Sequence, residues 1–122
     1  MSTSTSTKAD QKNFGTPDET RSFERGKVDI VSVAGSDIGR LTLEPGWRWS
    51  EHVKPIAGTD LCEAPHFQFQ LSGHLKIRME DGTEYDGRPG DVVSVPHGHD
   101  AWVVGDETVV LVDWWGASNY AK

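Results

Sequence analysis

The sequence of 122 residues contains a single cysteine, Cys62, and therefore cannot form an internal disulfide. A lone thiol is typical of reducing compartments, so we expect a cytoplasmic protein. No apolar run approaches the roughly 20 residues that span a bilayer, and the N-terminal segment lacks the apolar stretch of a signal peptide. Basic residues are scarce: 12 Lys and Arg stand against 19 Asp and Glu, a net charge of −7. Nucleic acids and anionic membranes attract basic surfaces, so neither is predicted as a partner.

The length suits one domain with one hydrophobic core. Residues 1–22 are polar and rich in Ser and Thr, and such a segment buries too little apolar area to offset its ordering entropy. We therefore expect a disordered N-terminal tail over 1–22 and one folded domain over 23–122, whose β-barrel architecture rests on its strand pattern. Deleting residues 2–21 should then change the free energy of unfolding by less than about 1 kcal/mol. The alternative is that Phe14 or Phe23 holds this segment against the barrel or a second subunit.

From residue 25 onward the sequence predicts an all-β protein. Short runs of Val, Ile, Leu and Thr are interrupted by glycine at intervals of about eight to twelve residues, which is typical of sandwiches and barrels. Asp81 and Gly82 form a dipeptide that favours a tight hairpin turn. The expected strands cover residues 28–33, 39–43, 47–54, 66–71, 75–79, 83–85, 91–95, 101–104 and 108–114.

Two blocks of glycine and histidine carry a resemblance to a known family. The first runs from Gly46 over five residues to His52, and continues through His66 to Gly73. The second runs from Gly90 over five residues to the tetrapeptide at 96–99, Pro-His-Gly-His. These blocks resemble the two motifs of the cupin superfamily, over roughly residues 39–114. The resemblance implies a single-domain jelly-roll β-barrel that holds one metal ion in its lumen.

The resemblance also implies a ligand set of three imidazoles: His52, His66 and His99. His52 matches the first histidine of the family's first motif, and His66 lies at the position of its acidic ligand. His99 lies two residues before the usual histidine position, on the same face of its expected strand. Lys54 occupies the position of the second histidine, and a protonated lysine cannot ligate a metal. The implied cofactor is a divalent transition metal, Zn, Fe, Mn, Ni or Cu.

Alternation along the expected strands separates two faces around this ligand set. The resemblance implies that the face with His52 and His66 points into the barrel, so Trp47 and Trp49, on the opposite face, are expected to pack outside it. Cys62, in the loop that precedes His66, has two interpretations. It is either a buried, inert thiol or a partner of His66, four residues away, in a zinc site. A third hypothesis is a barrel without metal, whose lumen histidines are only hydrogen-bonded.

The remaining polar and aromatic side chains suggest how a small molecule would be held. Arg48 or Lys54 would bind a carboxylate, and Trp102 would stack against a planar group. Asp100 would orient the neighbouring His99. The expected substrate-binding residues are Arg48, Lys54, Gln68, Gln70 and Trp102.

Two classes of function follow from the resemblance. One is a metal-dependent enzyme acting on a small polar or aromatic molecule as an oxygenase, isomerase or lyase. The other is a metal-free small-molecule binding or sensory barrel without catalysis. The chain contains five tryptophans, more than a small barrel core readily accommodates, so we also expect a homodimer that buries an outer aromatic face.

Overall fold

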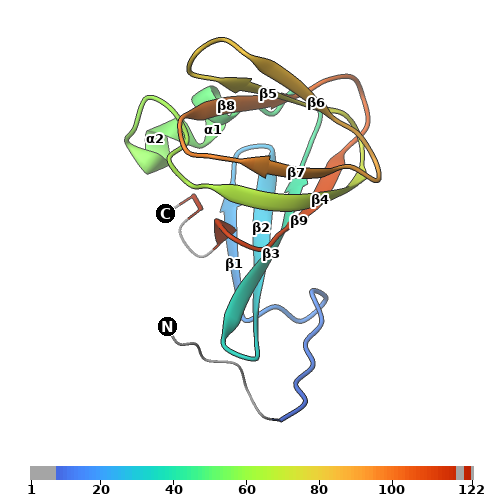
Figure 1. Ribbon diagram of the computed structural model, residues 1–122. Coiled ribbons are helices and arrows are strands. Elements are labelled where there is room, and N and C mark those ends of the chain that lie inside the picture. The colour runs from blue at the N-terminus through green and yellow to red at the C-terminus, as the bar shows by residue number, and fades with distance from the viewer. Residues whose placement is uncertain (1–7, 118–119, 122) are drawn as a thin grey trace.

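The computed structural model describes residues 8–117 and 120–121. Over these residues nine strands and two short helices follow one another along the chain (Figure 1). Their bounds are β1 Glu19–Phe23, β2 Gly26–Val33, β3 Ser36–Leu43, α1 Trp49–His52, α2 Lys54–Ala57, β4 His66–Ser72, β5 Leu75–Met79, β6 Glu84–Gly87, β7 Val92–Val95, β8 His99–Val103 and β9 Val109–Asp113.

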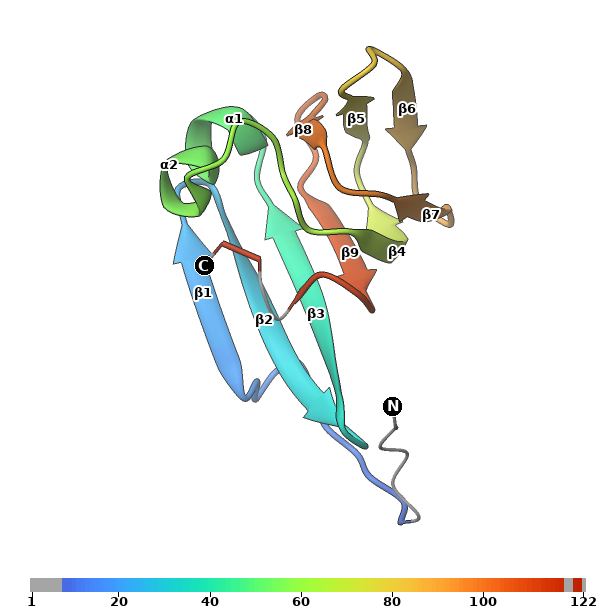
Figure 2. The same cartoon turned by 60° about the vertical axis from the view of Figure 1, so that its left-hand side comes forward.

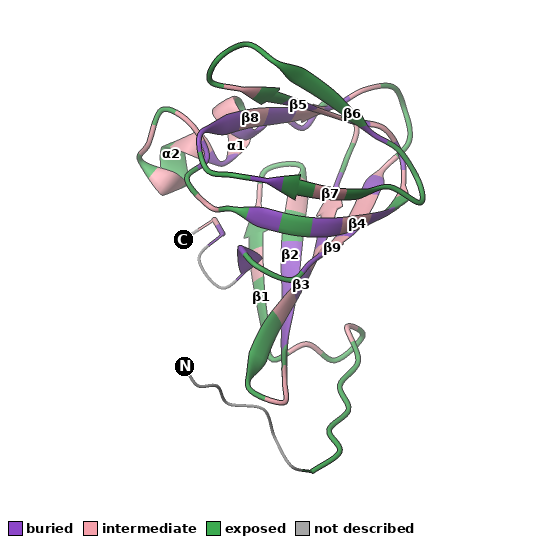
Figure 3. Ribbon diagram, viewed as in Figure 1, coloured by how far each residue is buried: buried purple, intermediate pink, exposed green. Residues whose placement is uncertain are grey.

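The strands form two antiparallel sheets. The larger has the order β1-β2-β3-β9-β4-β7, and the smaller has the order β6-β5-β8. The smaller sheet lies opposite β4 and β7, while the β2–β3 hairpin extends well beyond it (Figures 1 and 2). Buried residues occur in both sheets (Figure 3), and the buried hydrophobic ones form a single core cluster. This architecture confirms the predicted all-β jelly-roll.

Alternation along β4 and β9 builds the inner wall of the barrel. In β4, His66, Gln68 and Gln70 are buried, whereas Phe67 is exposed, as the sequence pattern predicts. In β9 the inward residues include Asp113, which pairs with Gln68 in the register of the two strands. Two adjacent strands therefore place polar side chains inside the barrel.

The prediction of a strand over residues 47–54 is wrong. From Trp49 onward the chain forms α1 and α2, one helical turn each, and in α1 the amide N–H groups of His52 and Val53 donate to the carbonyls of Arg48 and Trp49. Helical spacing buries Trp49 and Val53 together and turns His52 away from them. In residues 8–117 and 120–121, no helix is long and apolar enough to cross a membrane.

The expected boundary between tail and barrel at residue 22 does not match the structure. β1 begins at Glu19 and pairs along its whole length with β2. Arg21 donates hydrogen bonds to the carbonyls of Ala117 (3.2 Å) and Tyr120 (2.8 Å), and Thr20 donates to the buried carboxylate of Asp29. The composition of residues 1–22 did not predict β1, because this strand is stabilised by contacts with residues that are distant in the sequence. Residues 1–7 of the expected tail lie outside the described residues.

Candidate metal centre

Three potential metal ligands converge inside the barrel: Cys62, His66 and His99. One ligand atom from each lies within 4.8 Å of the others, and all three residues are buried. They come from the loop after α2, from the start of β4 and from the start of β8. The Sγ atom of Cys62 is 3.7 Å from Nε2 of His66, and the imidazole centroids of His66 and His99 are 5.1 Å apart.

Backbone hydrogen bonds bring Cys62 into this group. The amide N–H of Cys62 donates to the carbonyl of His99 (2.8 Å), and the amide of Gly98 donates to the carbonyl of Cys62 (2.7 Å). This isolated bridge lies alongside β8 and holds the loop after α2 against the barrel. The position of the Cys62 thiol is therefore fixed by backbone hydrogen bonds between its loop and β8.

Asp113 anchors His66 from the opposite side. Its Oδ2 atom is 2.5 Å from Nδ1 of His66, and its Oδ1 atom accepts the amide N–H groups of Phe67 and Trp115 at 3.1 Å each. The Asp113 side chain is fully buried. The ion pair directs Nε2 of His66 toward Cys62, as carboxylate–histidine pairs do behind metal sites.

A backbone carbonyl anchors His99 in the same way. Nδ1 of His99 donates to the carbonyl of Pro96 at 2.9 Å, which leaves Nε2 as the nitrogen available to a ligand. Both histidines thus have one nitrogen anchored and the other available beside the thiol. Two nitrogens and one sulfur form a donor set suited to zinc and to other transition metals with affinity for thiolate.

The electrostatics of the cluster favour an ionised thiol. Burial raises the pKa of Cys62, but hydrogen bonds and charge from His66 and His99 outweigh this and lower the pKa to about 6. Burial lowers the pKa of His66, whereas the contacts with Asp113 and Cys62 raise it to about 9. At neutral pH the cluster is therefore a thiolate beside an imidazolium, and a divalent metal would replace the proton on His66.

His52, a predicted ligand, does not join the cluster. It lies on α1, where its Nδ1 accepts the amide N–H of Arg48 at 3.0 Å and its Nε2 faces the carboxylates of Glu24 and Glu51. Lys54, on α2, pairs with Asp60 at 3.5 Å. Both residues lie outside the barrel interior because they belong to short helices. The alternation of side chains expected of a strand therefore does not apply to them.

Arg48, Asp100 and Trp102 form a separate group on the outer face of β8. The guanidinium of Arg48 stacks 4.1 Å from the centroid of the Trp102 ring and pairs with Asp100 at 3.4 Å. Asp100 also accepts the amide N–H of Ser50. Asp100 therefore orients α1 rather than His99, and Arg48 covers the ring face expected to receive a substrate.

Gln68 and Gln70 lie inside the barrel, as predicted, but the lumen is nearly filled. Gln70 donates to the backbone carbonyls of Gly73 and Gly87, so it closes the barrel rather than facing a ligand. Beside Gln68, a lumen space of about 30 Å³ remains. It is large enough for one water molecule, and the buried Nε1 of Trp47 on its wall has no partner among the described residues.

A second space reaches the cluster from outside. It has a volume of about 340 Å³, and Cys62 lies in its wall. Three aromatic rings line it, those of Trp49, Trp115 and Tyr120, and Glu63 is the acidic residue among the lining side chains. This groove, named here the Cys62 groove, is a route by which an ion or small molecule can approach the thiol.

Sequence reasoning missed the role of Asp113. Its position continues the buried alternation of Val109 and Leu111 in the last strand, which predicts an inward side chain. An inward carboxylate needs a positive or hydrogen-bonding partner. That signal was present in the sequence, but the identity of the partner depended on the register between β4 and β9.

Comparisons with known proteins identify the architecture. No protein-family model matches the sequence, and no curated protein matches it. Among solved structures, a cupin-like protein from Thermotoga maritima is 14% identical with a TM-score of 0.54, covering 82% of this chain and 74% of its own. Bacillus subtilis oxalate decarboxylase, as an S161A mutant, is 23% identical with a TM-score of 0.54, covering 84% of this chain and 28% of its own.

The 11S allergen of Cocos nucifera shares the same likeness at 22% identity and a TM-score of 0.58, covering 86% of this chain and 33% of its own. Identities this low establish fold and not activity. Together with the two antiparallel sheets and the inward histidines of β4 and β8, they show that this chain has the cupin fold.

Proposed function

We propose that this protein is a small metal-binding cupin in which Cys62, His66 and His99 hold one divalent transition metal. The observation that carries the proposal is the anchoring of both imidazoles at Nδ1, by Asp113 and by the carbonyl of Pro96, beside a buried thiol. Hydrogen-bonded imidazoles of this kind are the usual ligands of bound metals. Cys62 replaces His52 in the ligand set that the sequence predicts.

The spacing of the donor atoms suits such an ion. Tetrahedral zinc with bonds of about 2.3 Å to sulfur and 2.0–2.1 Å to nitrogen separates the two ligand atoms by about 3.5 Å. The distance from Sγ of Cys62 to Nε2 of His66 is 3.7 Å. The lumen space of about 30 Å³ next to His66 and His99 leaves room for a water molecule as a fourth ligand.

The small molecule handled at this centre would be a compact aromatic one. The nearly filled lumen excludes a substrate, so approach is through the Cys62 groove, whose walls carry Trp49, Trp115 and Tyr120. These rings would stack on an aromatic group and exclude water from the thiol. A bound metal would supply Lewis acidity toward an oxygen of that molecule.

Metal analysis of protein purified without a histidine tag tests the proposal. We expect about one transition metal ion per chain, and cobalt loading should produce a thiolate-to-metal absorption band. Replacing Cys62→Ser should remove that band, and Cys62→Ser or His99→Gln should weaken metal binding at least about tenfold. Because His52 lies outside the cluster, His52→Gln is the matched control and should leave metal content unchanged.

Three results would contradict the metal site. Cys62→Ser protein that keeps full metal content, or His52→Gln protein that loses it, would assign the ion to other ligands. Wild-type protein that takes up no transition metal would favour the alternative function, a metal-free small-molecule binding barrel. The ion pair between His66 and Asp113 supports that alternative, because it gives both buried groups a partner without a metal.

The outer face of β4 and β7 supports the proposal of a homodimer. Phe67 lies 4.9 Å from Trp115 and 6.4 Å from Trp114 between ring centroids, and Leu71 and Val92 extend this apolar surface. Exposed apolar and aromatic side chains that group in this way are typical of a protein interface.

We expect wild-type protein to sediment as a dimer at tens of micromolar, and Leu71→Lys with Val92→Lys to shift it to monomer, because buried lysines would lack partners. Ile56→Lys, on α2, introduces a positive charge at an exposed apolar site away from this surface and should leave the dimer intact. Sedimentation of wild-type protein as a monomer alone would contradict this expectation.

A further inference from the structure

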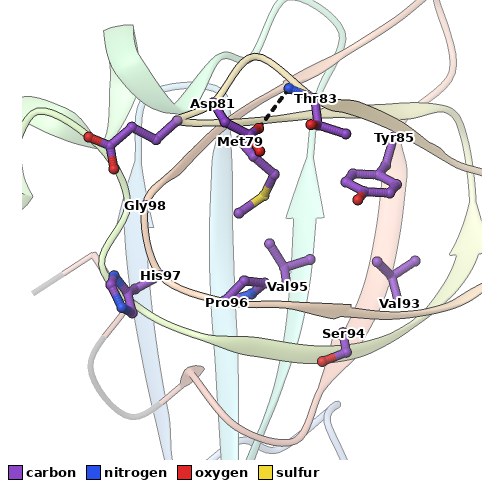
Figure 4. Close-up of a pocket in the computed structure, with 11 residues that line it drawn as sticks. Met79, Asp81, Thr83, Tyr85, Val93, Ser94, Val95, Pro96, His97 and Gly98 are labelled. Atoms are coloured by element: carbon purple, nitrogen blue, oxygen red, sulfur yellow. Dashed lines mark hydrogen bonds between the residues drawn. The ribbon is translucent and has the colours of Figure 1, made fainter.

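A cavity of about 640 Å³ lies between the β5–β6 hairpin and β7. Its walls come from the end of β5, the hairpin turn, β6, β7 and the turn that leads to β8 (Figure 4). Pockets that hold small ligands have volumes of roughly 300–1,000 Å³, so this cavity has a suitable size. Val95 is the residue that lines both this cavity and the lumen beside His66, so the two spaces lie on either side of it.

The cavity exists because the barrel wall is open at this point. β6 is an outer strand of the smaller sheet, β7 is an outer strand of the larger sheet, and the described strands contain no pairing between these two. The facing edges therefore retain backbone N–H and C=O groups that can bond a ligand. A side chain from each edge points into the opening, Tyr85 from β6 and Val93 from β7 (Figure 4).

The floor of the cavity is apolar. Met79 extends from β5 toward Val95 and Pro96, and the ring of Tyr85 lies over Val93 (Figure 4). Tyr85 lines the cavity and is 52% exposed. An aromatic or aliphatic group of a ligand would cover this exposed ring and the valine beside it.

The charged side chains at one end of the cavity are acidic. Glu80 and Asp81 stand at the hairpin end, and Asp81 is oriented by the amide N–H of Thr83, which donates to its Oδ1. Lys and Arg are absent from the described residues that line the cavity. The one basic side chain there, His97, has Glu63 at 3.6 Å. A cation is therefore the complementary charge for this end of the cavity.

From these four features we propose that the cavity binds a small organic amine with an aromatic or aliphatic body. The ammonium group lies at Glu80 and Asp81, and the apolar body lies on Tyr85, Met79 and Val93. Tyr85 is within the same cavity as the carboxylates, so its ring face also attracts a cation. This site does not depend on the metal proposed at Cys62.

Amide NMR titrations of the full chain with three probes of similar shape test the proposal. Phenethylamine carries the cation, 3-phenylpropionate reverses the charge, and 2-phenylethanol is neutral. With a chelator present to empty the metal site, phenethylamine should shift amides of residues 79–85 and 93–98. The carboxylate probe should bind at least about tenfold more weakly, because it meets like charges.

Variants separate charge from shape. Glu80→Gln with Asp81→Asn should weaken phenethylamine binding about fivefold and leave 2-phenylethanol unchanged, as expected for two exposed carboxylates. Asp106→Asn with Glu107→Gln removes the same charge from the turn before β9 and is the matched control. Tyr85→Ala should weaken both probes.

The site would be overturned by 3-phenylpropionate binding as tightly as phenethylamine, by amide shifts confined to other parts of the chain, or by the lack of any shift with any probe up to about 10 mM. The amine site would also lie elsewhere if the amide shifts caused by phenethylamine persisted in Glu80→Gln with Asp81→Asn but disappeared in Asp106→Asn with Glu107→Gln. Loss of metal binding at Cys62 would leave the amine titration unaffected.

Discussion

Replacing Asp113→Ala should lower the free energy of unfolding by about 3–5 kcal/mol, the range for breaking a buried ion pair. The carboxylate of Asp113 is fully buried and accepts hydrogen bonds from His66 and from the amides of Phe67 and Trp115. Burial raises the pKa of Asp113, but the His66 imidazole and these amides outweigh it and hold the pKa below its ordinary value. Alanine would leave a buried imidazole and two amides without partners. Denaturant unfolding measures the loss.

Asp113→Asn separates the metal site from the fold. The amide oxygen of asparagine can still accept the N–H groups of Phe67 and Trp115, but its NH₂ group would face Nδ1 of His66. His66 would then carry its proton on Nε2, the atom directed at Cys62, and metal affinity should fall about 10–100-fold. Stability should fall less than in Asp113→Ala.

A matched control for Asp113 is Asp86→Asn. Asp86 also pairs with a histidine, His74 at 2.6 Å, but at an exposed site on β6. This change should alter stability by less than about 1 kcal/mol and leave metal content unchanged. If Asp113→Asn bound metal as tightly as wild-type protein, Asp113 would have no role in orienting His66.

Deleting residues 2–21 should destabilise the barrel by at least about 3 kcal/mol, well above the small effect expected from composition. The deletion removes most of β1 and with it the hydrogen bonds from Arg21 to the carbonyls of Ala117 and Tyr120. It also removes the hydroxyl of Thr20 from the buried carboxylate of Asp29. A thermal or denaturant unfolding curve measures the change.

Shorter changes locate the cause. Deleting residues 2–7 leaves every described contact in place and is the matched control for the larger deletion. Arg21→Ala alone should cost about 1–3 kcal/mol, because two backbone carbonyls near the C-terminal end lose their donor. If the deletion of 2–21 unfolded at the same denaturant concentration as the full chain, β1 would contribute nothing to the fold.

The all-β architecture followed from the sequence pattern, and the inward position of His66, Gln68 and Gln70 followed from strand alternation together with the resemblance to cupins. They depend on alternation within a strand and on turn residues such as Asp81 and Gly82, which are local properties of the chain. The same alternation places His99 on the buried face of β8. The resemblance to cupins, based on glycine and histidine spacing, agrees with the fold found by structural comparison.

The tertiary structure alone decided the members of the site. His52 lies outside because helical hydrogen bonds bury Trp49 and Val53 while satisfying the backbone, so the parity of a strand never applies to 47–54. Cys62 meets His99 through a backbone bridge, and Asp113 meets His66 across two paired strands. Contacts of this kind depend on how distant strands align, and strand register is a property of the whole sheet rather than of any short stretch of sequence.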